Sequence, residues 1–328
     1  MSFSSDVKAE LKEQLSDARH CRIAEFAAIF ALSGHIKKDK EGNTYLEIHT
    51  ENLTVAQKSY ILLKCTFNAD VEIDIRNHNL QGSTVNYYLI VSNEHDVINI
   101  LKAVKVLDEQ KKIRGDFSVI HRIVVQNTCC KRAFLRGAFM VAGSITNPEK
   151  TYHMEIAVLS EKFAGQLKEI LAFFDIDAKI VERKKYSVVY VKEGSQIVDF
   201  LNVIGAHIAL MNFENVRILK EVRNSVNRQV NCETANISKT VNAAAKQIED
   251  IKYIECNMGF SQLSDGLREV AELRLDYPES SLQELGKMLE KPISKSGVNH
   301  RLRKLSEIAN DLRNKKSTLP YQKEDMKS

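Results

Sequence analysis

The segment from Lys291 to Ser306 is rich in side chains that contact nucleic acids. It contains five Lys or Arg residues and His300, but no Asp or Glu. Arg bonds guanine edges and Asn bonds adenine, while Lys and the amino end of a helix hold phosphates. The candidate DNA-contacting residues are Lys291, Ser294, Lys295, Ser296, Asn299, His300, Arg301, Arg303 and Lys304. A basic outer face is also common on purely structural helices, and this alternative stays open.

Apolar residues at helical spacing predict three short helices around this segment. Tyr277-Pro278 ends the first helix, and Ser280 or Ser281 begins the second, with Glu284 placed for a capping box. The residues expected to face a core are Leu267, Val270, Ala271 and Leu273 in the first helix, Leu282, Leu285, Met288 and Leu289 in the second, and Val298, Leu302 and Leu305 in the third. Gly286 is small where another helix must cross closely.

The third helix is expected to begin at Ser294 or Ser296. If Val298, Leu302 and Leu305 face inward, the side chains of Ser296, Asn299, His300 and Arg303 face outward. This set of outward side chains is what a recognition helix carries near its start. The pattern therefore predicts a helix-turn-helix.

The preceding part of the chain repeats itself. The segment Arg22–Ile36 resembles Arg132–Ile145, so that Gly34 falls on Gly143, 109 positions later. Each half has an Ala- and Gly-rich helix, a hairpin, a second helix, two alternating strands and a third helix. The later helices are expected at Leu53–Phe67, Asp96–Leu107, Glu161–Phe174 and Ser195–Ala206. The order αββαββα, twice, predicts an α+β fold.

The first helices of the two halves have small residues on one side, which allow two helix backbones to approach closely. These residues are Ala24, Ala27, Ala28, Ala31 and Gly34 in the first half and Gly137, Ala138, Ala142 and Gly143 in the second. A pseudo-twofold pair of αββαββα halves packed in this way resembles the LAGLIDADG homing endonucleases. In the active enzymes of that family, an acid before the final glycine of each motif binds a divalent metal.

Ser33 and Ala142 occupy these two acid positions. Neither provides a carboxylate ligand, so the sequence predicts no metal, no cofactor and no enzyme activity, and a residual nuclease is the weaker alternative. The paired helices would then be kept for architecture.

The outward sheet faces leave two interpretations open. Glu72 and Asp74 are expected on the outer face of the first half, where carboxylates repel phosphate. The second half and the first hairpin are more basic, with Lys179, Arg183, Lys184, Lys185 and Lys192, and with Lys37, Lys38 and Lys40. These faces could contact DNA, or they could be solvated or bind a protein.

The whole chain resembles the WhiA family of bacterial sporulation and cell-division proteins. The most specific segments are Ser225–Lys239, Leu273–Gly286 and Ile293–Leu305. The resemblance implies a non-catalytic, sequence-specific DNA-binding protein, with the helix-turn-helix as the principal reader. It also implies transcription regulation in cell division and chromosome segregation. The alternative is a protein-interaction scaffold of the division or chromosome machinery, with DNA binding secondary.

The expected domains are a degenerate LAGLIDADG-like pair over 1–215, with halves at about 1–110 and 111–215, then a helical connector over 216–256. A helix-turn-helix domain over 257–314 and a disordered tail over 315–328 follow. The connector contains Asn224, Asn227, Asn231 and Asn236, which suggest that helices begin or break there. The expected partners are double-stranded DNA and, through residues 1–215, another transcription regulator or division protein.

Composition gives weaker constraints. The net charge is only +4, and from Lys220 onward there are 19 Lys and Arg against 16 Asp and Glu. No segment suits a signal peptide or a bilayer interior, so we expect a cytoplasmic, nucleoid-associated protein without membrane contact. Six cysteines without a CxxC motif, including the adjacent Cys129 and Cys130, favour reduced and mostly buried thiols.

Overall fold

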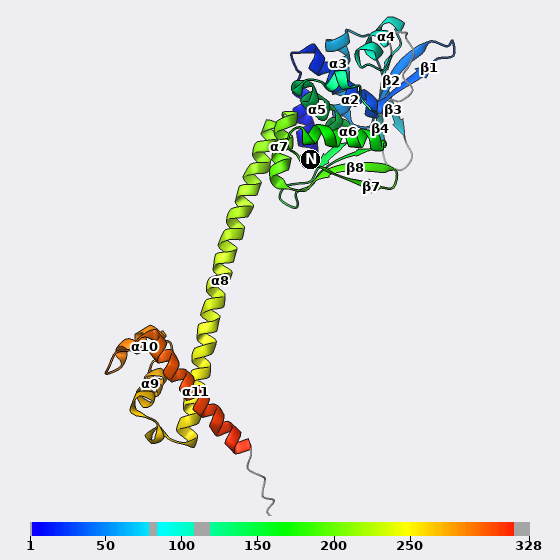
Figure 1. The fold of residues 1–328 in the computed structure, drawn as a ribbon. Coiled ribbons are helices and arrows are strands. Elements are labelled where there is room, and N and C mark those ends of the chain that lie inside the picture. Colours follow the sequence, from blue (N-terminus) through cyan, green and yellow to red (C-terminus); the bar gives the residue numbers. More distant parts are fainter. Residues whose placement is uncertain (1, 79–83, 108–118, 318–328) are drawn as a thin grey trace, which may run out of the picture. The chain divides into compact units, whose positions relative to one another are not determined.

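The computed structural model describes residues 2–78, 84–107 and 119–317. The chain forms two compact units, Met1–Glu221 and Val222–Ser328, and each is considered by itself. Figure 1 shows the elements of each unit. None of the helices in the described ranges is long and apolar enough to cross a membrane.

The first unit begins with a helix that precedes the repeat, α1 (Phe3–Glu13). Ser2 caps it by accepting a hydrogen bond from the Ser5 amide, and Val7 and Leu11 are fully buried. The sequence does not predict this helix, because the segment is mostly polar and charged and its buried face has only two apolar residues, one turn apart.

The repeat is confirmed, and both halves have the order αββαββα. The first half contains α2 (Arg19–Ser33), β1 (Gly34–Lys38), β2 (Thr44–Thr50), α3 (Leu53–Phe67), β3 (Glu72–His78), β4 (Thr84–Val91) and α4 (Glu94–Ala103). The second half contains α5 (Thr128–Ala142), β5 (Gly143–Ile145), β6 (Met154–Val158), α6 (Glu161–Ala172), β7 (Lys179–Arg183), β8 (Tyr186–Val191) and α7 (Gly194–Ile204). The 3₁₀ helix η1 (Arg122–Val125) precedes α5.

Each half builds one antiparallel sheet, and the two sheets have matching strand orders, β1-β2-β4-β3 and β5-β6-β8-β7. The register pairs His49 with Tyr88 and Asp74 with Tyr88, so these three side chains share one face of the first sheet. Glu155 pairs with Tyr190, and Lys179 pairs with the same Tyr190, in the second sheet. The equivalent strands of both halves therefore present equivalent faces.

Helices α2 and α5 lie side by side at the centre of the first unit (Figure 1). A Cβ atom at Gly137 would lie 2.3 Å from the backbone oxygen of Glu25 and 3.0 Å from the Cβ of Ala28. Any side chain at Gly137 would push the two helices apart. The predicted role of small residues in a close helix contact is thus confirmed at this position.

The two central helices also end alike. Gly34 ends α2 and Gly143 ends α5, both with extended backbone. A Cβ at Gly34 would lie 2.2 Å from the ring of Phe30, and one at Gly143 would lie 2.1 Å from the ring of Phe139. The glycine that closes each motif therefore makes room for an aromatic ring one turn earlier.

A buried ionic network joins helices α1, α2, α3 and α5. Glu25 Oε1 accepts a hydrogen bond from Arg136 Nε at 3.1 Å and lies 3.0 Å from Lys58 Nζ. The Glu25 and Lys58 side chains are fully buried. Lys58 also donates to the backbone oxygens of Leu11 and Gln14. Burial lowers the pKa of Lys58, while the neighbouring Glu25 raises it.

One helix, α8 (His207–Asn257), follows without interruption over 51 residues. The prediction that the Asn-rich stretch begins or breaks helices is wrong. Asn costs only a fraction of a kcal/mol per helical residue, and no Gly or Pro occurs within α8. The flanking Gly205 and Gly259 have positive φ angles, +86° and +78°. The predicted boundary at residue 215 falls inside α8.

The second unit continues with η2 (Phe260–Gln262), α9 (Asp265–Asp276), α10 (Leu282–Met288) and α11 (Lys295–Ser317). Because α11 extends to Ser317, residues 315–317 are helical, although the sequence predicts that they begin a disordered tail. The remainder of that predicted tail, 318–328, lies outside the described residues. All six cysteines are free, and only Cys21 and Cys130 are buried, so the prediction of mostly buried thiols is also wrong.

Candidate nucleic-acid interface

A single apolar core fixes the position of α11 in the second unit. Val298, Leu302 and Leu305 are at most 1% exposed, as predicted. They pack with residues of α9 and α10 and with Ile251 and Ile254 near the end of α8. With these residues inside, the opposite side of α11 must face solvent.

The predicted core of α9 and α10 needs two corrections. Met288 is 46% exposed, whereas Leu285 and Leu289 are buried. Arg274, which the apolar pattern did not include, is only 3% exposed. Met288 ends a short helix and lies beyond its buried stripe, so helical spacing alone misplaces it.

Arg274 fastens the connection between α9 and α10. Its guanidinium donates to the backbone oxygen of Ser280 at 2.8 Å and, through two nitrogens, to Gln247 Oε1 at 3.1 and 3.0 Å. Burial lowers the pKa of Arg274. This side chain holds α8, α9 and the following turn together by hydrogen bonds to uncharged partners.

The predicted capping box begins α10. Glu284 N donates to Ser281 Oγ at 3.3 Å, and Ser281 N donates to Glu284 Oε2 at 2.8 Å. The hydrogen bond from the Ser281 amide, together with the Ser281 side chain, lowers the pKa of Glu284. Two backbone amides at the start of the helix are thereby satisfied, which sets the angle at which the chain enters α10.

The turn from α10 to α11 depends on Gly286. A Cβ there would lie 2.5 Å from the backbone oxygen of Ile293 and 3.2 Å from Val298. Ile293 N donates to Gly286 O at 3.0 Å. Ser294 then begins α11, since its hydroxyl accepts from Gly297 N at 3.3 Å. The sequence predicted that the helix begins at Ser294 or Ser296, and in the structure Ser294 is the capping residue.

The structure brings the predicted site residues together on the turn before α11 and on its first three turns. The exposed ones are Lys291, Ser294, Lys295, Ser296, Asn299, His300, Arg303 and Lys304. Arg301 differs, because it is half buried and donates to the backbone oxygen of Gly266 in α9 at 3.2 Å. Arg301 therefore connects α11 to α9, whereas the sequence predicted that it contacts DNA.

Most of these polar groups have no partner among the residues that the structure describes. Within the described part of the chain, Lys295, Asn299 and Arg303 take part in no salt bridge or side-chain hydrogen bond. The first acid of α11 is Glu307, more than a turn beyond Arg303 on the chain. The start of α11 is therefore positively charged, exposed and rigidly supported, as a helix that enters a DNA groove requires.

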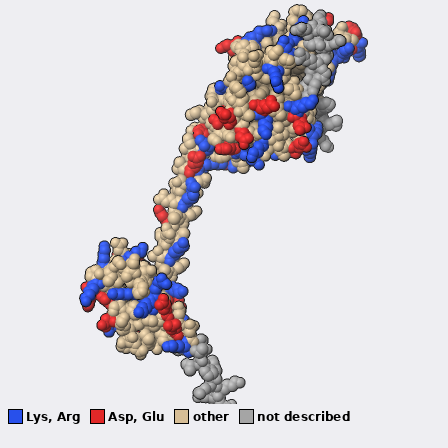
Figure 2. All heavy atoms as spheres, in the orientation of Figure 1, with Lys and Arg blue, Asp and Glu red and all other residues tan. Residues whose placement is uncertain are grey.

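The sheet of the first half uses its charges differently. Lys37 Nζ donates to Glu47 Oε1 at 2.6 Å, which raises the pKa of Lys37. Arg76 donates to Asp74 at 2.8 Å and stacks over the ring of Tyr88, 4.4 Å from its centroid. Figure 2 shows acidic and basic side chains intermixed over the visible face of this unit.

The sheet of the second half is more basic but also contains an internal cluster. Glu155 Oε2 lies 3.1 Å from Arg183 Nη1 and 3.0 Å from His153 Nε2. Lys192 lies over the ring of Tyr190. Lys179 and Lys184 are exposed and take part in no ion pair among the described residues. Both lysines are therefore available to a phosphate.

The positions of the missing acids are filled by small groups. Ser33 is buried, and its hydroxyl donates to the backbone oxygen of Ile29 at 2.8 Å. Ala142 is partly buried at the end of α5. The Ser33 hydroxyl therefore bonds within its own helix. The active enzymes have a metal ligand at this position.

The fold and the site define a class of protein: a LAGLIDADG-like pair followed by a helical helix-turn-helix domain. Three family models match this division, the WhiA N-terminal LAGLIDADG-like domain over residues 19–107, the WhiA LAGLIDADG-like domain over 131–223 and the WhiA C-terminal HTH domain over 226–309. The chain belongs to the WhiA family.

Relatives and a solved structure agree over almost the whole length. A protein of Lachnoclostridium phytofermentans named "Probable cell division protein WhiA" is 56% identical over 95% of this chain and 100% of its own. A protein of Alkaliphilus metalliredigens with the same name is 45% identical over 96% of this chain and 99% of its own. The crystal structure of full-length DUF199/WhiA from Thermatoga maritima covers 95% of this chain and 99% of its own at 27% identity, with a TM-score of 0.57.

Proposed function

We propose that this chain is a non-catalytic, sequence-specific DNA-binding protein that regulates transcription in bacterial cell division and chromosome segregation, with α11 as its recognition helix. The observation that carries the proposal is the exposed face of α11. There Asn299 and Arg303, one turn apart, lie on a helix whose other side is fully buried. The names of the relatives support a role in cell division, and the HTH family model supports DNA binding.

The physical argument separates two kinds of contact. Lys295 and the amino end of α11 would hold phosphates, which gives affinity without sequence preference. Asn299 and Arg303 have the donor and acceptor groups that match base edges in the major groove. Arg301, with its contact to Gly266, would support α11 and leave base recognition to its neighbours.

In vitro selection tests this proposal. The full-length chain is used to enrich duplexes from a random library, and the enriched site is then titrated at several salt concentrations. We expect affinity that falls steeply with salt. Replacing Lys295 by Gln should reduce the salt slope by about 1 for every sequence, since one phosphate contact is lost. Failure of the library to yield any preferred sequence would contradict sequence-specific recognition.

The absence of catalysis is part of the same proposal. The end of α2 has a buried serine hydroxyl bonded to Ile29, and the end of α5 has Ala142, so neither helix end supplies a carboxylate for Mg²⁺. Incubation of the chain with supercoiled plasmid and Mg²⁺ should leave the plasmid intact. Magnesium-dependent cleavage that a Ser33→Ala variant loses would contradict this.

A second candidate function is specific to residues 1–215. On the first sheet Lys37 pairs with Glu47 and Arg76 pairs with Asp74, and His49 stacks on Tyr88 with ring centroids 4.6 Å apart. A charge-balanced, aromatic face suits a protein partner better than phosphate. The partner would be another transcription regulator or a division protein.

Crosslinking in cells distinguishes the two uses of this face. If it binds protein, Tyr88→Ala in the full chain should remove a specific crosslinked partner and leave the affinity for the selected duplex unchanged. If the variant instead loses affinity for the duplex, the face contacts DNA and the scaffold interpretation is wrong.

A further inference from the structure

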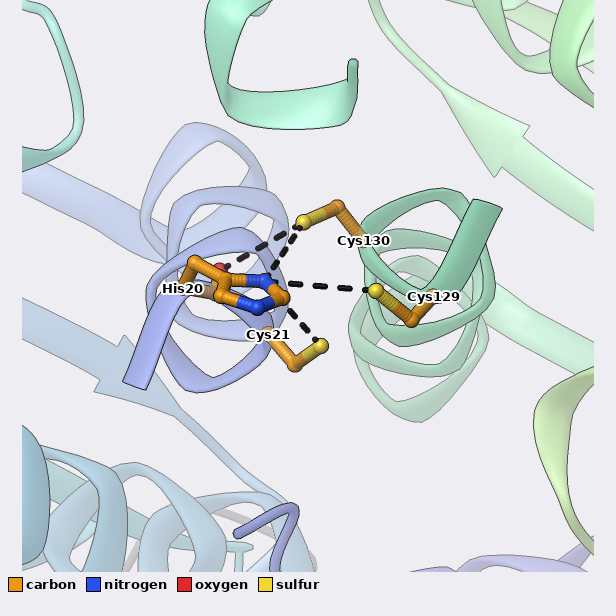
Figure 3. Close-up of side chains that lie close together, drawn as sticks. All are labelled: His20, Cys21, Cys129 and Cys130. Carbon is orange, nitrogen blue, oxygen red and sulfur yellow. Dashed lines mark hydrogen bonds between the residues drawn. The ribbon is translucent and has the colours of Figure 1, made fainter. Parts of the chain in front are cut away.

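Four metal-binding side chains meet at the beginning of the two central helices. His20 and Cys21 lie in the first turn of α2, and Cys129 and Cys130 lie in the first turn of α5. Figure 3 shows that the two pairs point toward one another from neighbouring helices. Cys129 follows His20 by 109 positions, which is the offset of the internal repeat, so the pairs are pseudo-symmetry equivalents.

The distances among these side chains suit one tetrahedral ion. All four ligand atoms lie within 4.8 Å of one another. His20 Nδ1 is 3.1 Å from Cys130 Sγ, 3.4 Å from Cys21 Sγ and 4.0 Å from Cys129 Sγ. Tetrahedral zinc, with Zn–S of about 2.3 Å and Zn–N of about 2.0 Å, separates sulfur from nitrogen by about 3.5 Å. The three distances lie on both sides of this value.

The surroundings also favour a cation held by thiolates. Neither Ala18 before α2 nor Asn127 before α5 makes a side-chain cap hydrogen bond, and the four side chains lie in the first turns of these two helices. The positive end of a helix stabilises a thiolate.

We propose that His20, Cys21, Cys129 and Cys130 bind one zinc ion in a Cys₃His site that joins α2 to α5. Zinc binding replaces the protons of the three thiols, which are released to solvent. All four ligand positions are filled by protein atoms, which is typical of a structural site. The ion would link the two halves of the first unit at the beginning of the central helices, opposite the helix ends where the nuclease acids are missing.

The prediction of no metal came from the missing nuclease acids, and the cysteines, which form no CxxC motif, indicated only reduced thiols. Neighbouring residues on a helix diverge by about 100°, so an adjacent pair alone does not indicate a site. The signal that could have revealed it is the repeat. At an offset of 109, His20-Cys21 falls on Cys129-Cys130.

Metal analysis of the full-length chain tests the proposal. The protein is purified with a thiol reductant, without chelator and without a histidine tag, and metals are measured by mass spectrometry. We expect about one zinc per chain. Titration with Co²⁺ should give the visible absorption of a tetrahedral site and the near-ultraviolet sulfur-to-cobalt charge transfer. A chelator should lower the thermal unfolding temperature of the wild type.

Cys129→Ser and His20→Gln are the test variants, because both positions are exposed and their replacement leaves the core intact. We expect each to weaken zinc binding by at least the roughly 10- to 100-fold that loss of an outer partner costs. Cys65→Ser, at an exposed cysteine of α3, is the matched control and should retain zinc. Circular dichroism checks that all three fold.

Several results would overturn the zinc site. They are a wild type with no more zinc than Cys129→Ser, an equal loss in Cys65→Ser, iron in place of zinc, and a disulfide among these cysteines in the reduced preparation. The site does not depend on the proposed DNA binding. An Arg303→Ala chain should lose DNA affinity and retain its zinc, so the two proposals fail separately.

Discussion

The first sheet and the start of α11 both carry basic side chains, but the pairing of these side chains with acids differs. On the sheet, Lys37 neutralises Glu47 and Arg76 neutralises Asp74. On α11, Lys295 and Arg303 have no acidic partner within the described residues. With a net charge of only +4, composition could not distinguish these regions. Whether a basic side chain is available to DNA depends on its neighbouring residues and not on the net charge of the chain.

The same contrast separates residues that support the fold from residues that act on a partner. Glu25, Lys58 and Arg136 are charged but buried, and their interactions join helices of the first unit. Asn299 and Arg303 are exposed and contribute little to packing. Substitutions in the first group should therefore change stability, and substitutions in the second should change DNA binding.

The largest effect is expected from Glu25→Gln. This change leaves Lys58 and Arg136 buried without a counter-charge, and loss of one partner of a buried ion pair costs about 3–5 kcal/mol. Calorimetry should show a lower unfolding temperature for the first unit. Asp74→Asn, which breaks an exposed pair, is the control and should have little effect. Equal destabilisation by both variants would remove the distinction between buried and exposed charges.

Arg303→Ala should give the next largest effect, on DNA binding alone. If Arg303 contacts a base, its loss costs about 1–3 kcal/mol of affinity for the selected duplex and relaxes the preference at one position. Stability should change by less than about 0.5 kcal/mol, since the side chain is exposed. Arg268→Ala, at an exposed arginine of α9, is the control. A similar loss of affinity in this control would place DNA recognition elsewhere on the second unit.

Ser281→Ala should destabilise the second unit by about 1 kcal/mol, because the Glu284 amide loses its cap. The hydroxyl supports α10 and lies outside the predicted DNA-contacting set, so the affinity of the folded protein for its site should stay the same. Thermal denaturation and a binding titration on one preparation check both points. A change in sequence preference would show that Ser281 itself contacts DNA.

Lys37→Gln should have the smallest effect, below about 1 kcal/mol, because the pair with Glu47 is partly exposed on the lysine side. The hydrogen bond to Glu47 raises the pKa of Lys37 above its ordinary 10.5. The stabilisation is therefore present below pH 10.5 and is lost as the pH rises through the higher, folded-state pKa. The wild-type and variant stabilities should converge in that alkaline range, and a difference that persists there would exclude the ion pair as its cause.

Much of the architecture follows from local patterns. The repeat with Gly34 on Gly143 predicts both αββαββα halves, and the capping box at Ser281 and Glu284 predicts the start of α10. The inward positions of Val298, Leu302 and Leu305 follow from helical spacing. These features depend on residues close in the chain or on a repeat that is visible by direct comparison.

The features that escaped prediction depend on distant residues or on small energies. The burial of Arg274 becomes understandable only once Gln247 and Ser280 lie beside it. The continuity of α8 depends on Asn penalties that are too small to break a helix. The proposed zinc site requires α2 and α5 to lie side by side. Sequence spacing within one segment carries none of this information.

The most direct test of the central claim is chromatin immunoprecipitation of three full-length proteins from cells: the wild type, Arg303→Ala, and a Lys179→Gln/Lys184→Gln variant of the second sheet. If α11 recognises DNA and the sheets do not, the wild type and the sheet variant should occupy the same discrete sites, and Arg303→Ala should lose them at equal protein level. Unchanged occupancy by Arg303→Ala, together with loss in the sheet variant, would contradict this account.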